Sequence, residues 1–179
     1  LIAHKNIVED LKEKVISKLN KMDFKQSLAT EDQFNKVKSF IDRARKASGL
    51  NIIGGDIDES RLFISPTIVE YNDTSHELYK EEIFGPILTV STFSSEKEAL
   101  QIANDTEYGL AASIWTNDMI KANRIVRKIN AGRFWINSKQ VNFPELPVGG
   151  TGISGIGREA GLQGILSYSE IKSVIFSDD

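Results

Sequence analysis

Strand-like and helix-like segments alternate through the second half of the chain, and this rhythm constrains the fold more than any other feature. Residues 87–93, 111–115 and 133–136 are rich in β-prone side chains. The stretches between them, 95–104 and 117–129, have helical spacing and begin with capping residues. Strands that alternate with helices favour parallel βαβ units. The sequence therefore predicts a layered α/β fold with a mostly parallel sheet.

The helices of this pattern are expected to be amphipathic. Residues 7–22 carry apolar side chains at helical spacing, and a capping box from Thr30 to Gln33 opens a further helix that Gly49 ends. The apolar face of that helix is Phe34, Val37, Phe40, Ile41 and Ala44. In the helix that begins at Asn117 or Asp118, the side chains expected to face inward are Ile120, Ile125, Val126 and Ile129. Short strands are predicted at 51–53, 62–64 and 67–69.

Composition excludes several classes of function. The chain has 179 residues, 40% of them hydrophobic and 26% charged, which is typical of a globular domain with a core. Its net charge of −3 shows no basic excess, so neither a nucleic acid nor a membrane is an expected partner. No apolar run approaches the roughly 20 residues of a membrane span. The sequence has no cysteine and no His/Asp/Glu cluster with ligand spacing, so no metal site is predicted. A cytoplasmic location is the default expectation.

The segment Glu81-Glu82-Ile83-Phe84-Gly85-Pro86 is the sharpest local motif. Gly85 permits close backbone approach, and we expect an extended segment, in which Glu82 and Phe84 point to the same side. A carboxylate can accept two hydrogen bonds from the hydroxyls of a ribose, and an aromatic face can pack on a flat ring. The alternative is a surface glutamate beside a core phenylalanine.

A second candidate site follows the strand at 133–136. Loops at strand ends are where α/β domains bind ligands. This loop is polar and carries one cation, Lys139, although a solvated surface lysine is the alternative interpretation. The candidate binding residues are Asn137, Lys139, Gln140, Asn142 and Val148.

The end of the chain is β-prone again, at Ile171, Val174, Ile175 and Phe176. A terminal strand must pair with something or remain an exposed edge. It is therefore either an edge strand of the same domain or a strand that pairs across a subunit boundary. Arg158 and Glu170 could form an ion pair that fastens it, or they are two unrelated surface charges.

Three motifs together resemble the C-terminal part of the NAD(P)-dependent aldehyde dehydrogenases: Glu-x-Phe-Gly-Pro at 82–86, Asn137, and Pro147-Val148-Gly149-Gly150 followed by Ser154 to Glu159. The resemblance spans the whole chain. It implies that residues 1–168 belong to the catalytic domain and that 169–179 form an oligomerisation strand. It further implies that Glu82 and Phe84 meet the nicotinamide end of NAD or NADP, and that the 137–148 loop lines an aldehyde tunnel. The implied contacts within a homodimer or homotetramer are Arg158, Glu170, Val174 and Phe176.

That family works through a cysteine thiolate, which this chain lacks. The resemblance places the cysteine, the general-base glutamate and the N-terminal cofactor-binding domain upstream of Leu1, so we expect a fragment that is inactive alone. The resemblance implies that in the complete enzyme the thiolate attacks the aldehyde to give a thiohemiacetal, that hydride then passes to the nicotinamide and leaves a thioester, and that water hydrolyses the thioester to the carboxylic acid. The polar loop with Lys139 suits an aldehyde that bears a carboxylate, such as succinate semialdehyde. The alternatives are a non-catalytic interaction module that kept the fold, and a reductase relative acting on acyl phosphates or acyl thioesters.

Overall fold

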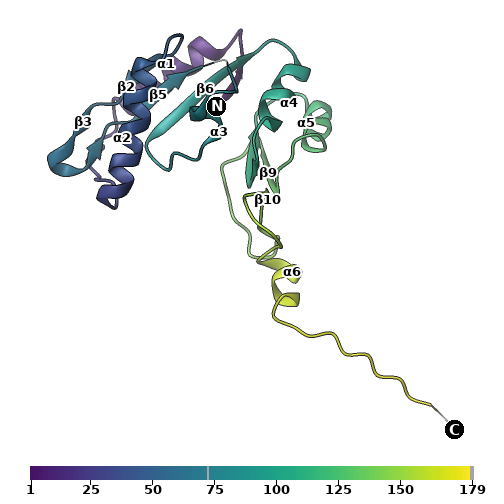
Figure 1. The fold of residues 1–179 in the computed structure, drawn as a ribbon. Helices are drawn as coiled ribbons and strands as arrows, with labels where there is room; N and C mark the ends of the chain where they lie inside the picture. Colours follow the sequence, from purple (N-terminus) through teal and green to yellow (C-terminus); the bar gives the residue numbers. More distant parts are fainter. Residues whose placement is uncertain (72, 178–179) are drawn as a thin grey trace. The chain divides into compact units, whose positions relative to one another are not determined.

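The computed structural model describes residues 1–71 and 73–177, and the chain divides into two compact units (Figure 1). Unit 1 is Leu1–Asp105, and unit 2 begins at Thr106. The elements of unit 1 are β1 (Ile2–His4), α1 (Val8–Leu19), α2 (Glu31–Lys46), β2 (Asn51–Gly54), β3 (Ile57–Asp58), a 3-10 turn at Glu59–Arg61, β4 (Phe63–Ile64), β5 (Thr67–Glu70), α3 (Glu77–Lys80), β6 (Ile87–Phe93) and α4 (Glu96–Asn104).

A four-stranded sheet with the order β1-β6-β5-β2 forms the centre of unit 1. Strand β6 runs parallel to both β1 and β5, which agrees with the predicted parallel sheet. Strand β2 is antiparallel to β5, and the chain between them holds only the β3–β4 hairpin. A parallel pair would need a longer crossover, usually a helix, so this connection produces an antiparallel edge.

The two faces of this sheet are covered by different helices, as two adjacent residues of β5 illustrate. Ile68 packs with Ala3, Val8 and Val90, on the face that α1 covers. Val69 packs against the apolar face of α2, on the other side. Both side chains are 1% exposed, because successive side chains of a strand point to opposite faces. The predicted inward face of α2 is confirmed, since all five of its apolar residues are buried.

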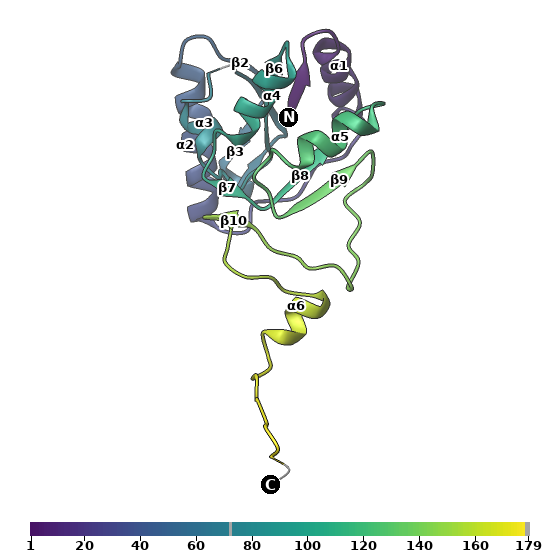
Figure 2. The ribbon, with the colours of Figure 1, turned by 90° about the vertical axis from the view of Figure 1, so that its right-hand side faces the viewer.

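Unit 2 contains a parallel β–α–β unit, as the alternating pattern predicted. Figure 2 shows α5 leading from β8 into β9. Its elements are β7 (Tyr108–Gly109), β8 (Ala111–Ile114), α5 (Met119–Val126), β9 (Arg133–Ile136), β10 (Thr151–Gly152) and α6 (Gly161–Leu166). The prediction for Ile120 is wrong, because this side chain is 78% exposed while Ala122 is buried. Ile120 lies about 200° round the helix from Ala122, so the two cannot share a face.

The chain after α6 has neither helix nor strand over the described residues 167–177 (Figure 1). The apolar residues predicted as a terminal strand are exposed here: Ile171, Val174, Ile175 and Phe176. They pair with no described strand of this chain, so the interpretation as an edge strand of the same domain is wrong. Pairing across a subunit boundary stays a prediction.

Candidate functional site

The Glu81–Pro86 segment links α3 to β6 and presents two side chains away from the core of unit 1. Ile83 is buried at 8% exposure, whereas Glu82 and Phe84 on either side of it are exposed. Phe84 is 70% exposed, so the alternative of a core phenylalanine is wrong. The expected extended geometry is also wrong at this residue, since Phe84 has a φ of 58°, in the left-handed region. Both side chains are exposed, one on each side of the buried Ile83.

Side chains of helix α2 hold this loop by donating hydrogen bonds to the backbone carbonyls of the loop. Gln33 Nε2 donates to the carbonyl of Phe84 at 2.6 Å, and Lys36 Nζ donates to the carbonyl of Glu82 at 2.9 Å. Gly85 lies against the same helix, where an added Cβ would come within 2.6 Å of Val37 Cγ2. A left-handed conformation at a non-glycine residue costs about 1–2 kcal/mol, so neighbours must maintain it. These contacts with α2 hold Phe84 in its left-handed conformation.

Sequence reasoning missed Gln33 and Lys36 as residues of this site. The predicted capping box is formed only in part, since Thr30 Oγ1 accepts from the backbone N–H of Gln33 at 3.2 Å. The side chain of Gln33 does not return to the N-cap but donates to the carbonyl of Phe84 instead. The available signal was the spacing of a glutamine and a lysine on one side of a helix, which does not identify a partner 51 residues away.

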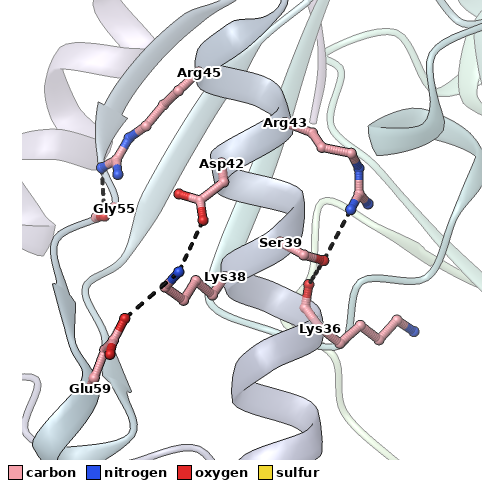
Figure 3. A network of polar contacts seen from close by, with 8 residues as sticks. All are labelled: Lys36, Lys38, Ser39, Asp42, Arg43, Arg45, Gly55 and Glu59. Carbon is pink, nitrogen blue, oxygen red and sulfur yellow. Dashed lines mark hydrogen bonds and ion pairs between the residues drawn. The ribbon is translucent and has the colours of Figure 1, made fainter.

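The helix that leads into the loop is tied to α2 by a chain of polar contacts. Arg43 binds both carboxylate oxygens of Glu77, at 2.6 and 3.0 Å, and the hydrogen bond from Arg43 holds the pKa of the Glu77 carboxyl below its ordinary value. Arg43 also donates to Ser39 Oγ at 3.0 Å, and Ser39 donates to the carbonyl of Lys36 at 2.7 Å (Figure 3). This chain connects α3 to the turn of α2 that carries Lys36.

Helix α3 is fastened to α4 as well. The hydroxyl of Tyr79 donates to the carbonyl of Ile102, and Lys80 Nζ contacts Asp105 Oδ1 at 2.5 Å. Burial, with the Asp105 carboxylate as a second cause, raises the pKa of Tyr79 to about 12. The phenol therefore stays a hydrogen-bond donor at neutral pH. Contacts from two helices thus fix the backbone that enters the Glu82–Phe84 loop.

The side chains of Glu82 and Phe84 take no part in the contacts that hold their loop. Within the part of the chain that the structure describes, the Glu82 carboxylate forms no hydrogen bond or ion pair, because its loop is held through carbonyl groups. An unpaired carboxylate beside an open aromatic face fits a ribose with an attached flat ring. The residues present are therefore compatible with the nicotinamide end of a dinucleotide.

In unit 2, the side chain of Asn137 ties the end of β9 to the backbone of Thr116. Its Oδ1 accepts from the backbone N–H of Thr116 at 2.9 Å, and its Nδ2 donates to the carbonyl of Thr116 at 2.8 Å. Asn137 also has a left-handed φ of 49°. The amide that sequence reasoning assigned to substrate binding is occupied by the backbone between β8 and α5.

The other predicted residues of this loop have open side chains. Lys139, Gln140 and Asn142 are exposed and form no side-chain hydrogen bond or ion pair with the described residues. Val148 is half-buried, and its backbone exchanges two hydrogen bonds of 2.8 Å with Glu159. The loop therefore presents three polar groups and closes at Val148.

The predicted ion pair between Arg158 and Glu170 is not formed among the described residues of the chain. Arg158 Nη1 donates instead to the carbonyls of Gly150 and Gly157, at 2.8 and 2.7 Å. The bridge between Val148 and Glu159 brings the two ends of this loop together, and the guanidinium of Arg158 is therefore within reach of both carbonyls. A contact between subunits through Arg158 and Glu170 stays a prediction.

Within residues 1–71 and 73–177, no group of three or more His, Cys, Asp or Glu side chains could hold a metal ion. No helix of this part combines the length and the apolar content needed to cross a membrane.

Residues 1–174 match the model of the aldehyde dehydrogenase family, and the chain therefore belongs to that family. A chloroplastic betaine aldehyde dehydrogenase of Beta vulgaris is 41% identical over 148 residues, which are 81% of this chain and 30% of the relative. A peroxisomal aminoaldehyde dehydrogenase of Pisum sativum is 33% identical over 186 residues, covering 97% of this chain and 37% of the relative.

Solved structures agree with the fold. A betaine aldehyde dehydrogenase of Staphylococcus aureus, crystallised with NAD+, superimposes with a TM-score of 0.86 at 34% identity. The match covers 93% of this chain and 36% of that one. The chain spans about a third of the length of the relatives it matches.

Proposed function

We propose that this chain is part of the catalytic domain of an NAD(P)-dependent aldehyde dehydrogenase, which oxidises an aldehyde to a carboxylic acid. The observation that carries the proposal is the outward pair of Glu82 and Phe84 on a loop held by carbonyl contacts. Membership of the family supports it, and so does the NAD+ in the complex of the similar S. aureus enzyme.

In this proposal, the chain holds the cofactor and borders the aldehyde. The carboxylate of Glu82 accepts hydrogen bonds from ribose hydroxyls, and the ring of Phe84 packs on the nicotinamide. A nicotinamide cofactor, when bound, supplies the acceptor for the hydride. A cysteine thiolate elsewhere in the complete enzyme forms a thioester, which water releases as the acid.

Replacing Glu82 by alanine in the complete enzyme tests this role. Hydride transfer is sensitive to misplacement on the ångström scale, so Glu82→Ala should lower kcat by about tenfold or more and change the KM for aldehyde less. Glu81→Ala is the matched control, because Glu81 is an exposed glutamate one residue away that ends α3. A variant that raises the KM for aldehyde at unchanged kcat would remove Glu82 from the cofactor site.

For the substrate, two classes of aldehyde have specific support. The ammonium of Lys139 is exposed and pairs with no described residue, which favours an aldehyde that bears a carboxylate, such as succinate semialdehyde. The names of the similar proteins, betaine and aminoaldehyde dehydrogenases, favour a cationic aldehyde. Lys139 would attract the first class and repel the second.

Lys139→Ala distinguishes the two classes. The ratio kcat/KM for a carboxylated aldehyde should fall about two- to fivefold, because an exposed charge pair contributes at most about 1 kcal/mol. The same ratio for an aminoaldehyde should stay constant or rise. Lys139 would be a solvated surface lysine if the wild-type enzyme prefers the aminoaldehyde and Lys139→Ala leaves kcat/KM unchanged for both classes of aldehyde.

We further propose that the apolar tail takes part in self-association of the enzyme, as a homodimer or homotetramer. Val174 and Phe176 are 63% and 88% exposed, and no described strand of the chain covers them. Exposed β-prone segments of this kind are protected when they pair with another chain. Arg158 and Glu170 are the polar residues proposed to lie at the same contact.

A further inference from the structure

We propose that Trp135 and Arg133 are positioning residues that fix the path of segment 138–143 through one atom, the carbonyl oxygen of Val141. They would thereby set where Lys139 and Gln140 lie, and so contribute to selection among aldehydes. The inference rests on the proposed function for its role in catalysis, whereas the anchoring itself depends only on unit 2.

Two donors converge on the Val141 carbonyl. Trp135 Nε1 donates to it at 2.9 Å, and Arg133 Nη2 donates at 3.4 Å. The guanidinium of Arg133 also lies 4.9 Å from the centre of the Trp135 ring, so the two side chains hold each other in place. A carbonyl oxygen has two lone pairs, and here both are engaged by strand β9.

The donors belong to a rigid platform. Arg133 and Trp135 are two residues apart in β9, so their side chains leave the same face of the strand. Four residues of β9 are in register with four of β8, from Ala111 opposite Arg133 to Ile114 opposite Ile136. The backbone positions of both donor residues are therefore determined by the pairing of β9 with β8.

The anchor acts at the centre of a tight turn. The backbone N–H of Val141 donates to the carbonyl of Lys139 at 2.8 Å, and Ser138 Oγ donates to the same carbonyl at 3.0 Å. These two bonds tie Lys139 to Val141 and to Ser138 within one turn. Holding the Val141 carbonyl holds the backbone from which the exposed Lys139 and Gln140 side chains project.

Burial does not explain the position of this turn. The side chain of Val141 is 44% exposed, and residues 137–147 are all exposed. A segment with so little buried apolar surface is not held by packing, so its hydrogen bonds to β9 decide its path. Burial does not force the indole N–H to bond to this carbonyl either, since Trp135 is only half-buried and its N–H is able to donate to water.

The anchor can be tested on the chain itself by limited proteolysis with trypsin. Trp135→Phe keeps the ring and removes the donor, and cleavage after Lys139, followed by mass spectrometry, should become about two- to tenfold faster. Trp115→Phe is the matched control, since Trp115 is 68% exposed and forms no hydrogen bond with the described residues. Equal cleavage rates in wild type and Trp135→Phe, or an equal acceleration in both variants, would overturn the anchor.

A second variant keeps the test decisive if Trp135→Phe lowers the melting temperature. Arg133→Met removes the longer of the two hydrogen bonds and leaves the backbone pairing of β9 intact, so cleavage after Lys139 should rise by a smaller factor. An unchanged rate in a well-folded Arg133→Met variant would leave no anchoring role for Arg133.

The role in selectivity is read from kinetics of the complete enzyme. Trp135→Phe should raise the KM for aldehyde severalfold while kcat and the KM for the cofactor stay constant, a split that general destabilisation does not produce. An active enzyme whose aldehyde KM does not respond would overturn the selectivity role. A complete wild-type protein that oxidises no aldehyde would instead overturn the proposed function, and the proteolysis result would still stand for the anchor.

Discussion

At the scale of single residues, Asn137 shows why a sequence locates a site more readily than it assigns a role. Its place at the end of a predicted strand was correct, and such places bind ligands in α/β proteins. The direction of its amide depends on Thr116, which is 21 residues away in sequence. Glu82 and Phe84 could be proposed from the sequence because their motif is local, whereas the contacts of Gln33 and Lys36 could not, because their partners are distant in sequence.

Substitutions at Asn137 should separate its two contributions. Asn137→Gly removes both hydrogen bonds to Thr116 but tolerates the left-handed backbone, whereas Asn137→Ala removes the bonds and adds strain. We expect both variants to lower the free energy of unfolding, with alanine lower by about 1 kcal/mol more. Urea denaturation measures the difference, and equal values for the two variants would contradict a strained backbone at this position.

At the scale of elements, helical and strand periodicity predicted what local patterns determine. Strand β9 has the predicted bounds, and α2 buries the predicted face. Periodicity misplaced Ile120, since an apolar residue near a helix end can lie outside the buried stripe. It could not predict the polar side of α2, on which Arg43, Ser39 and Lys36 are linked by hydrogen bonds (Figure 3). Arg43 on this side contacts Glu77 of α3, and Lys36 contacts the carbonyl of Glu82.

The connection between α2 and α3 should depend on pH through Glu77. Its folded-state pKa lies below the ordinary 4.5, so the ion pair with Arg43 stabilises the fold above that value and is lost as the pH falls through the folded-state pKa. Glu77→Gln should therefore melt at a lower temperature than wild type at about pH 6, and lose less on going to about pH 3. If the melting temperatures of wild type and variant change by the same amount over this pH range, the ion pair contributes nothing to stability.

At the scale of the whole molecule, the tail is the part that this chain alone does not complete. A β-prone sequence predicts a strand, but a strand forms only where a partner edge exists. The described residues 167–177 have no such partner within the chain and adopt no regular structure. The sequence therefore indicates a tendency to form a β-strand, and the described residues 167–177 of one chain do not form it.

Charge in the tail should reduce self-association of the complete enzyme. The double variant Val174→Asp and Phe176→Asp places two carboxylates where an apolar contact is proposed, so the mass from sedimentation should fall to that of a smaller species. Ser173→Asp is the control, because it adds a charge in the same exposed stretch without removing an apolar side chain. An unchanged mass for the double variant would rule out assembly through the tail.

The glycine at position 132, just before β9, has a consequence for how this protein can vary. An added Cβ would lie 1.8 Å from the carbonyl oxygen of Gly149, a backbone atom that no rotamer change can displace. Gly49 differs, since nothing lies within 4 Å of the same added atom and only its φ of 84° is unfavourable. In a saturation library of this gene, codon 132 should tolerate only synonymous changes, whereas codon 49 should accept several amino acids at reduced fitness.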